Sequence, residues 1–174
     1  MPKAPVLPPL EACREQALKL LELRPHGEAE LRRKLMQRRK HAMADIQAVM
    51  ADLVRIGLVD DRAFARMFCE SLKESGAGRL KARSKMRLKG LSEELVQETL
   101  EQYWAADGEE ETDRALALAR RKWRALVRSG RPLLAIRQSL ARFLAGRGFS
   151  ADVIGTVHYN RDFQTIKEKL HEEE

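Results

Sequence analysis

The chain has 174 residues, of which 44% are hydrophobic, enough to bury the core of one compact domain or of a row of small modules. Charged residues make up 34%, and the formal net charge is +7 with a pI of about 9.7. This surplus favours a polyanionic partner such as nucleic acid, an anionic membrane or an acidic protein surface, although a helical protein with a basic wet face would carry the same charge.

Composition and length argue against several classes of protein. Strong helix formers dominate and β-branched residues are scarce, so a large sheet is not expected. No apolar run approaches the roughly 20 residues of a membrane span, and the N-terminus lacks a signal-peptide core, so we expect a cytoplasmic protein without membrane contact. Cys13 and Cys69 share no metal-ligand spacing and are expected to be half-buried thiols in a reducing compartment.

Helical signals begin after a proline-rich arm. The first ten residues carry four prolines and are predicted not to be helical. A first helix is expected to end before Pro25, and a second covers residues 27–38. A third, over residues 44–56, is closed by Gly57, and its apolar stripe follows the helical period at Ile46, Val49, Met50, Leu53 and Ile56.

A second and a third round of three helices follow. Asp60 or Asp61 is predicted to cap the first helix of the second round, residues 79–89 form its second helix, and Ser92 caps its third. A polar, acidic linker over residues 106–111 precedes a long helix. The last two helices are predicted from Pro132, which suits a first helical turn, and from Ser150, which suits a cap.

Two turns repeat in detail. KGLSEELV, starting at Lys89, and RGFSADVI, starting at Arg147, share the pattern basic, glycine, apolar, serine, any residue, acid, apolar, apolar. Such a match predicts an internal helical repeat of roughly fifty residues. The sequence therefore predicts an all-α fold of three tandem three-helix units. The expected divisions are an N-terminal arm (1–11), the units 12–59, 60–106 and 107–160, and an acidic tail (161–174).

Residues typical of catalysis are sparse. The four histidines share no ligand spacing, and the sequence holds no HExxH, paired CxxC or P-loop motif. Ser84 has no base near it in the sequence, and a helix cap explains the neighbouring acids Asp60 and Asp61 better than a metal site does. We therefore expect a protein that binds rather than an enzyme, with no metal and no cofactor.

Basic residues concentrate in the segment GRLKARSKMRLKG, where they occupy every second position. The residues between them favour a helix over a strand. On a helix, the arginines and the lysines form two stripes on nearly opposite sides, which we call the arginine edge (Arg79, Arg83 and Arg87) and the lysine edge (Lys81, Lys85 and Lys89). Like charges four residues apart destabilise a helix slightly, which indicates either a polyanionic partner or neutralising glutamates from neighbouring helices.

Aromatic residues do not predict a stacking platform for single-stranded nucleic acid. Phe64, Phe68, Trp123 and Phe143 fall on apolar stripes and are expected in the core. Trp104, at a helix end, is a candidate for exposure. Contact with phosphates is therefore a better expectation than sequence-specific reading of bases.

Three stretches resemble the RecX family of recombination regulators over about residues 14–160. ALKLLELRPHGEAELRRKLMQR resembles its opening signature, LVRIGLVDDRAFA its next signature, and GRLKARSKMRLKGLSEELV its basic helix and turn. The chain departs from the family pattern at Gly27, where a serine cap is usual, and at Arg38 and Arg39, where the usual turn contains glycine. The third unit matches more loosely.

The resemblance implies an elongated, curved protein that binds along the groove of the RecA–DNA filament. It implies inhibition of filament growth, ATP hydrolysis and strand exchange, without catalytic residues or a cofactor. We expect the protein to be a monomer. The partners would be the RecA filament and single- or double-stranded DNA, contacted through phosphates. A general helical DNA-binding module is the alternative. The residues expected to make contact are Arg32, Arg33, Arg38, Arg79, Arg83, Arg87, Arg124 and Arg137.

Overall fold

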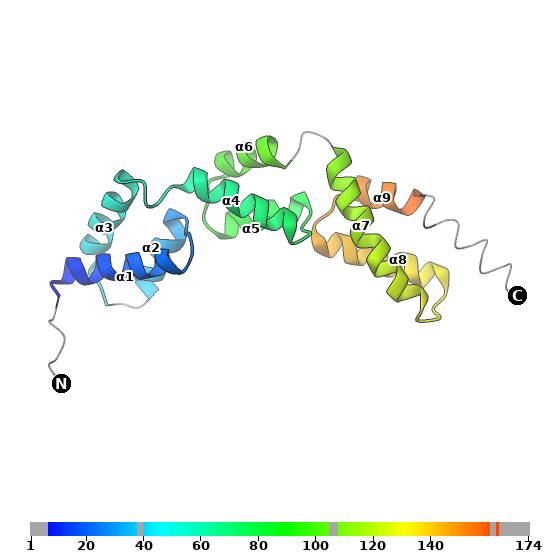
Figure 1. The fold of residues 1–174 in the computed structure, drawn as a ribbon, viewed down its shortest axis with the longest axis horizontal. Helices are drawn as coiled ribbons and strands as arrows, with labels where there is room; N and C mark the ends of the chain where they lie inside the picture. The colour runs from blue at the N-terminus through cyan, green and yellow to red at the C-terminus, as the bar shows by residue number, and fades with distance from the viewer. Residues whose placement is uncertain (1–6, 38–39, 105–107, 161–162, 164–174) are drawn as a thin grey trace, which may run out of the picture. The chain divides into compact units, whose positions relative to one another are not determined.

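The computed structural model describes residues 7–37, 40–104, 108–160 and 163. Within these residues the chain forms nine α-helices and no strand, which confirms the all-α expectation (Figure 1). The helices are α1 (Pro9–Leu23), α2 (Glu28–Gln37), α3 (Met43–Arg55), α4 (Asp61–Glu74), α5 (Arg79–Leu88), α6 (Glu93–Tyr103), α7 (Gly108–Val127), α8 (Leu133–Arg147) and α9 (Ala151–Tyr159).

We call α1–α3 repeat 1, α4–α6 repeat 2 and α7–α9 repeat 3. By its internal contacts the chain divides into two compact units that do not coincide with these repeats. Contact unit 1 comprises Met1–Phe68 and Met86–Val96, and contact unit 2 comprises Cys69–Lys85 and Gln97–Glu174. Repeat 1 therefore shares a unit with one part of repeat 2, and repeat 3 shares a unit with the other part.

Repeat 1 encloses its own apolar core. Helix α3 packs against both α1 and α2, and its buried side chains recur at the helical period. Four of the core side chains are completely enclosed leucines or valines, and truncating a buried leucine to alanine typically costs about 2–5 kcal/mol. The buried residues are Cys13, Ala17, Leu31, Leu35, Ile46, Val49, Met50, Leu53 and Val59.

Repeat 3 has a second core in contact unit 2. The long helix α7 packs against both α8 and α9. Trp123 of α7 meets Phe163 edge-to-face, with ring centroids 5.2 Å apart. The buried residues are Ala115, Leu116, Ala119, Trp123, Ile136, Leu140, Leu144, Phe149, Val153, Val157 and Phe163.

The serine caps predicted in the repeated turn are confirmed, and the structure adds a left-handed glycine two residues before each of them. Ser92 Oγ accepts a hydrogen bond from the Leu95 amide at 3.2 Å, and Ser150 Oγ accepts one from the Val153 amide at 3.3 Å. Gly90 and Gly148 have φ values of 91° and 87°, in the region that glycine adopts without strain. The two copies of the pattern therefore build the same turn.

Three expected boundaries are wrong. Helix α1 begins at Pro9, within the arm expected to be non-helical, because proline is tolerated in the first turn of a helix. Helix α7 begins at Gly108, inside the expected acidic linker, since acids favour a helix N-terminus. Pro132 is the N-cap of α8 and lies one residue before its first turn.

Candidate polyanion-binding surface

The arginine edge of α5 is exposed along its length. Arg79, Arg83 and Arg87 all present their side chains to solvent. Arg87, whose side chain is 63% accessible, pairs with Glu93 across 3.1 Å (Nε to Oε2). Helix α5 therefore presents a row of planar guanidinium groups that an anionic ligand can reach.

The lysine edge of α5 is used inside the protein at both ends. Lys81 donates from Nζ to the Gly146 carbonyl at 2.9 Å. Lys89 is paired with the Glu30 carboxylate at 2.6 Å and lies over the Phe68 ring, 5.7 Å from its centroid. Of the lysine edge, only Lys85 is exposed. The two edges therefore differ: Lys81 and Lys89 bind groups of the protein itself, whereas the three arginines face outward.

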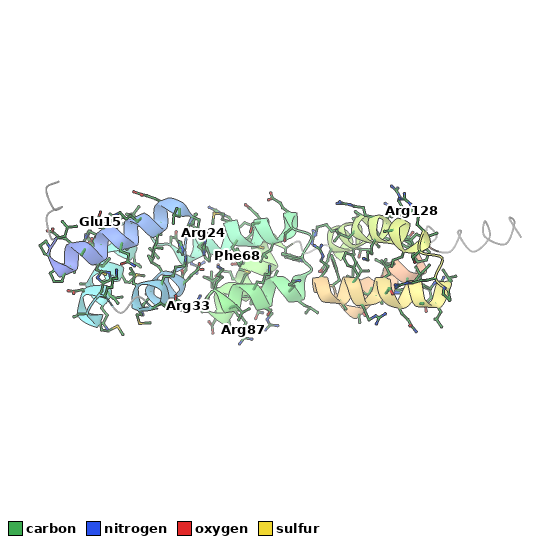
Figure 2. All side chains as sticks on the ribbon, turned by 90° about the horizontal axis from the view of Figure 1, so that it is seen from below. Glu15, Arg24, Arg33, Phe68, Arg87 and Arg128 are labelled. Carbon is green, nitrogen blue, oxygen red and sulfur yellow. The ribbon has the colours of Figure 1, made fainter. Side chains whose placement is uncertain are left out.

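Repeat 1 contributes exposed bases from α2. Arg32 and Arg33 are exposed, and Arg32 pairs with Glu28 one turn earlier at 2.5 Å. Figure 2 shows Arg33 and Arg87, both of contact unit 1, pointing to the same side of the molecule. Arg38, also expected to make contact, lies outside the described residues.

In contact unit 2, the predicted residues Arg124 and Arg137 have different surroundings. Arg124 of α7 is exposed, whereas Arg137 of α8 is half-buried. The Nε atom of Arg137 is enclosed and has no hydrogen-bond partner among the described residues. Burial, and then the charge of Arg137, lowers the pKa of His158. Arg137 is thus less available to a ligand than Arg124.

A buried ion cluster lies beside the exposed arginines of contact unit 1. Glu30 of α2 is 3% exposed. Its carboxylate accepts two hydrogen bonds from Arg24, at 2.7 and 3.0 Å, and a third from Lys89, at 2.6 Å. Burial alone raises the pKa of Glu30, but the hydrogen bonds from Arg24 and Lys89 outweigh it and lower the pKa to about 2. Glu30 is therefore ionised at neutral pH. No spacing in the sequence links it to Lys89.

His26 is enclosed next to this cluster. Its Nδ1 donates to the Arg24 carbonyl at 2.7 Å, and its Nε2 accepts from Lys34 Nζ at 2.8 Å. Burial and the neighbouring cations lower the pKa of His26. The imidazole is held neutral with both nitrogens occupied, which suits a structural role.

The paired acids at the start of α4 cap two different helices. Asp60 accepts hydrogen bonds from the amides of Arg62 and Ala63, at 2.8 and 3.1 Å, which confirms its predicted role as a cap. Asp61 accepts from the amide of Glu28 at 2.7 Å and so caps α2. A Cβ on Gly27 would lie 3.1 Å from both Asp61 Oδ1 and the Phe64 ring, so glycine at this position leaves room for the carboxylate.

Aromatic side chains do not form an exposed platform in the described residues. Trp104 is 1% exposed, so its expected exposure is wrong. Lys73 and Arg114 cover its ring, at 5.8 and 5.2 Å from the centroid. Phe64 and Trp123 are buried as predicted, while Phe68 and Phe143 are half-buried at the edges of the packed regions. These five aromatic residues therefore serve packing.

Other chemistry is not evident in the described part of the chain. There, no group of three or more histidine, cysteine or acidic side chains is placed to hold a metal ion. Cys13 and Cys69 are free and fully buried, more than the expected half-burial, and burial raises the pKa of both thiols. Among the same residues, none of the helices has the length and apolar character needed to cross a membrane.

Family models for the first, second and third three-helix domains of RecX match residues 13–53, 60–100 and 109–157. The chain belongs to the RecX family. The match of three successive models also confirms three tandem three-helix repeats.

Named relatives agree with this assignment. The protein called regulatory protein RecX in Deinococcus radiodurans is 37% identical over 144 residues, covering 83% of this chain and 65% of the relative. This chain thus spans slightly less than two thirds of that RecX protein. The regulatory protein RecX of Halorhodospira halophila is 35% identical over 147 residues, covering 83% of this chain and 84% of the relative.

Solved RecX structures share the fold. The crystal structure of RecX from Lactobacillus salivarius has a TM-score of 0.70 at 19% identity, covering 85% of this chain and 93% of that chain. A second crystal structure of regulatory protein RecX has a TM-score of 0.74 at 19% identity, covering 92% of this chain and 82% of the other. At this identity the likeness describes the fold alone.

Proposed function

We propose that this chain is a regulator that binds in the groove of the RecA–DNA filament and restrains filament growth, ATP hydrolysis and strand exchange. Membership of the RecX family, with relatives named regulatory proteins, supports the regulatory part. The exposed arginine edge of α5 is the observation that supports contact between this chain and the filament. In this proposal the protein acts by binding, as a monomer in the cytoplasm, and uses no cofactor.

Arginine at this edge suits a filament partner for a chemical reason. Its planar guanidinium group presents several donors to a phosphate or carboxylate, stays charged at any physiological pH and is weakly hydrated. A filament groove offers both DNA phosphates and acidic protein side chains to such groups. Arg137 is half-buried and a weaker candidate, whereas the exposed candidates are Arg32, Arg33, Arg79, Arg83, Arg87 and Arg124.

The test is a titration of the protein into RecA filaments assembled on single-stranded DNA, with ATP hydrolysis followed continuously. Hydrolysis is expected to fall at protein concentrations at or below those of RecA. The variant in which Arg79, Arg83 and Arg87 are all changed to Glu should inhibit much less while keeping its helical circular dichroism. An unchanged hydrolysis rate at stoichiometric protein would refute the regulatory proposal.

The second candidate is a general DNA-binding module without a RecA role, which the net charge of +7 favours. It predicts tight and strongly salt-dependent binding to naked DNA, with no effect on RecA beyond competition for DNA. Adding excess free DNA to the filament assay separates the two candidates. Inhibition that survives the excess supports a filament partner, and inhibition that disappears supports the general module.

A further inference from the structure

The second helix of repeat 1, α2, and the second helix of repeat 2, α5, are both capped by an acidic side chain from the next repeat. In contact unit 1 the Asp61 carboxylate accepts from the first amide of α2, Glu28 N, at 2.7 Å. In contact unit 2 the Glu111 carboxylate accepts from the first amide of α5, Arg79 N, also at 2.7 Å. Each acid lies at the start of the following repeat's first helix, so each repeat caps the second helix of the repeat before it.

The repeated glycine turn packs on the same first turns. A Cβ on Gly90 would lie 2.4 Å from Ala29 Cβ in α2. A Cβ on Gly148 would lie 2.3 Å from Lys81 Cβ in α5. Only glycine permits so close an approach, so the motif that reveals the repeats in the sequence also joins them. We call each of these contacts, Gly90 on α2 and Gly148 on α5, a joint.

Backbone hydrogen bonds complete the joint in contact unit 2. Gly78 N donates to the Arg147 carbonyl at 2.8 Å, and Leu80 N donates to the Gly148 carbonyl at 3.1 Å. Arg147 also donates from Nη1 to the Ser75 carbonyl at 2.8 Å. The basic residue that opens the motif therefore reaches across the joint in this copy.

In contact unit 1 the corresponding basic residue, Lys89, reaches across the joint to an acid. Its partner Glu30 lies in the first turn of α2, one turn before Arg33, and Lys89 follows Arg87 by two residues. This ion pair therefore ties together the two backbone positions from which Arg33 and Arg87 project. Figure 2 shows both arginines on one side of the molecule.

Stability alone does not require charges at this joint. Removing two ions from water costs about as much as their attraction returns, and a well-packed apolar pair often holds as firmly. Ion pairs in such places are best attested as devices that select one arrangement over others. A fixed arrangement matters for phosphate contacts, because arginines held in place lose less freedom on binding.

We propose that Glu30 and Lys89 are positioning residues, which fix Arg33 of α2 and Arg87 of α5 so that they engage neighbouring phosphates of one DNA strand together. This inference rests on the proposed role of the exposed arginines in DNA contact. It adds a role for a buried pair that does not touch the ligand. Breaking the pair is expected to weaken binding without reducing the number of phosphates contacted.

Two variants that change the net charge in opposite directions test the proposal. Glu30→Gln raises the net charge by one and Lys89→Gln lowers it by one, yet both break the same ion pair. Binding to a fluorescein-labelled single-stranded oligonucleotide of mixed sequence is measured by anisotropy between 50 and 200 mM salt, the range over which phosphate contacts change affinity most visibly. Both variants should lose affinity by about fivefold, with the slope of log affinity against log salt unchanged.

Lys85→Gln is the matched control, because Lys85 lies on the same helix, is exposed and carries the same charge. It should lose less affinity than Lys89→Gln. Affinity that rises in Glu30→Gln and falls equally in Lys89→Gln and Lys85→Gln would show that only net charge matters and would overturn the proposal. If Glu30→Gln loses its helical circular dichroism, Glu30→Asp replaces it, because it keeps the charge but shortens the reach to Lys89.

The same assay distinguishes failure of the positioning role from failure of the surface itself. Arg33→Gln and Arg87→Gln should each lower both the affinity and the salt slope. If neither does so, the proposed DNA contact fails and the positioning role fails with it. If both do so while the two ion-pair variants bind like the unaltered protein, only the positioning role is refuted.

Discussion

Asp61 caps a helix that begins 33 residues before it in the chain, since its Oδ1 lies 2.7 Å from the backbone nitrogen of Glu28. The adjacent Asp60 instead caps the helix that follows it directly. Two neighbouring carboxylates thus satisfy the free amides of two helices in consecutive repeats. The N-terminus of α2, which opens with Gly27 rather than serine, depends on repeat 2 for its cap.

Asp61→Ala is expected to lower the free energy of unfolding by about 1 kcal/mol, the usual loss when a helix cap is removed. The loss should appear in repeat 1, although the substitution lies in repeat 2. Amide hydrogen exchange measured by NMR should therefore accelerate at residues 28–31. Asp60→Ala is the matched control and should accelerate exchange at residues 62–64 instead. Equal protection of α2 in both variants would contradict the assignment.

Glu30 should make the stability of the protein depend on pH in the acid range. Because its pKa is lowered from 4.5 to about 2 in the folded chain, its stabilisation is complete above pH 4.5 and is lost as the pH falls towards 2. The loss is on the order of 3 kcal/mol, measured as the free energy of urea unfolding at successive pH values. Glu30→Gln should flatten this part of the profile, whereas Glu28→Gln, at an exposed pair, should leave it in place.

His26 should make the stability of the protein depend on pH in a second, higher range. Its pKa is lowered below the ordinary 6.5 by burial and by Arg24 and Lys34, so the unfolded chain takes up the proton first. Stability is therefore expected to fall as the pH drops below 6.5. His26→Asn keeps a donor for the Arg24 carbonyl and should remove this slope between pH 7 and 5. His41→Asn, which changes a histidine bonded to Gln16, should retain it.

Gly148 and Gly146 offer a test of the joint in contact unit 2. At Gly148, φ is +87° and an added Cβ would lie 2.3 Å from Lys81 Cβ, so Gly148→Ala should lower the free energy of unfolding by more than about 2 kcal/mol. Gly146 lies within α8 with nothing within 4 Å of an added Cβ. Gly146→Ala should raise stability by up to about 1 kcal/mol, since alanine is the better helix former. Thermal unfolding of both variants checks the opposite signs.

Local patterns in the sequence predict much of this fold, because their causes lie within a few residues. The turn at Gly90 and Ser92 is an example, since a left-handed glycine and a serine cap act on amides one to three residues away. Its second copy, at Gly148 and Ser150, then predicts the repeats. The start of α1 at Pro9 departs from the expectation because proline both breaks and begins helices.

Local patterns in the sequence predict the candidate polyanion-binding surface only in part. The sequence places the arginine and lysine edges of α5 symmetrically, and only the packed structure shows that Lys81 and Lys89 bind inward. Likewise, the position of Trp104 at a helix end predicts exposure, but in the structure Lys73 and Arg114 from other helices cover its ring. Contacts between distant segments decide which charges remain exposed, and no local spacing encodes them.

The arginine edge itself yields a quantitative prediction for DNA binding. Changing Arg79, Arg83 and Arg87 together to Gln removes up to three phosphate contacts, so the slope of log affinity against log salt on double-stranded DNA should become shallower by roughly 2.7. A control triple in which Lys19, Arg55 and Arg66 become Gln removes the same charge from exposed positions outside α5. Its slope should stay close to that of the unaltered protein. Equal slopes in the two triples would place the phosphate contacts elsewhere, because a general charge effect does not depend on which exposed bases are removed.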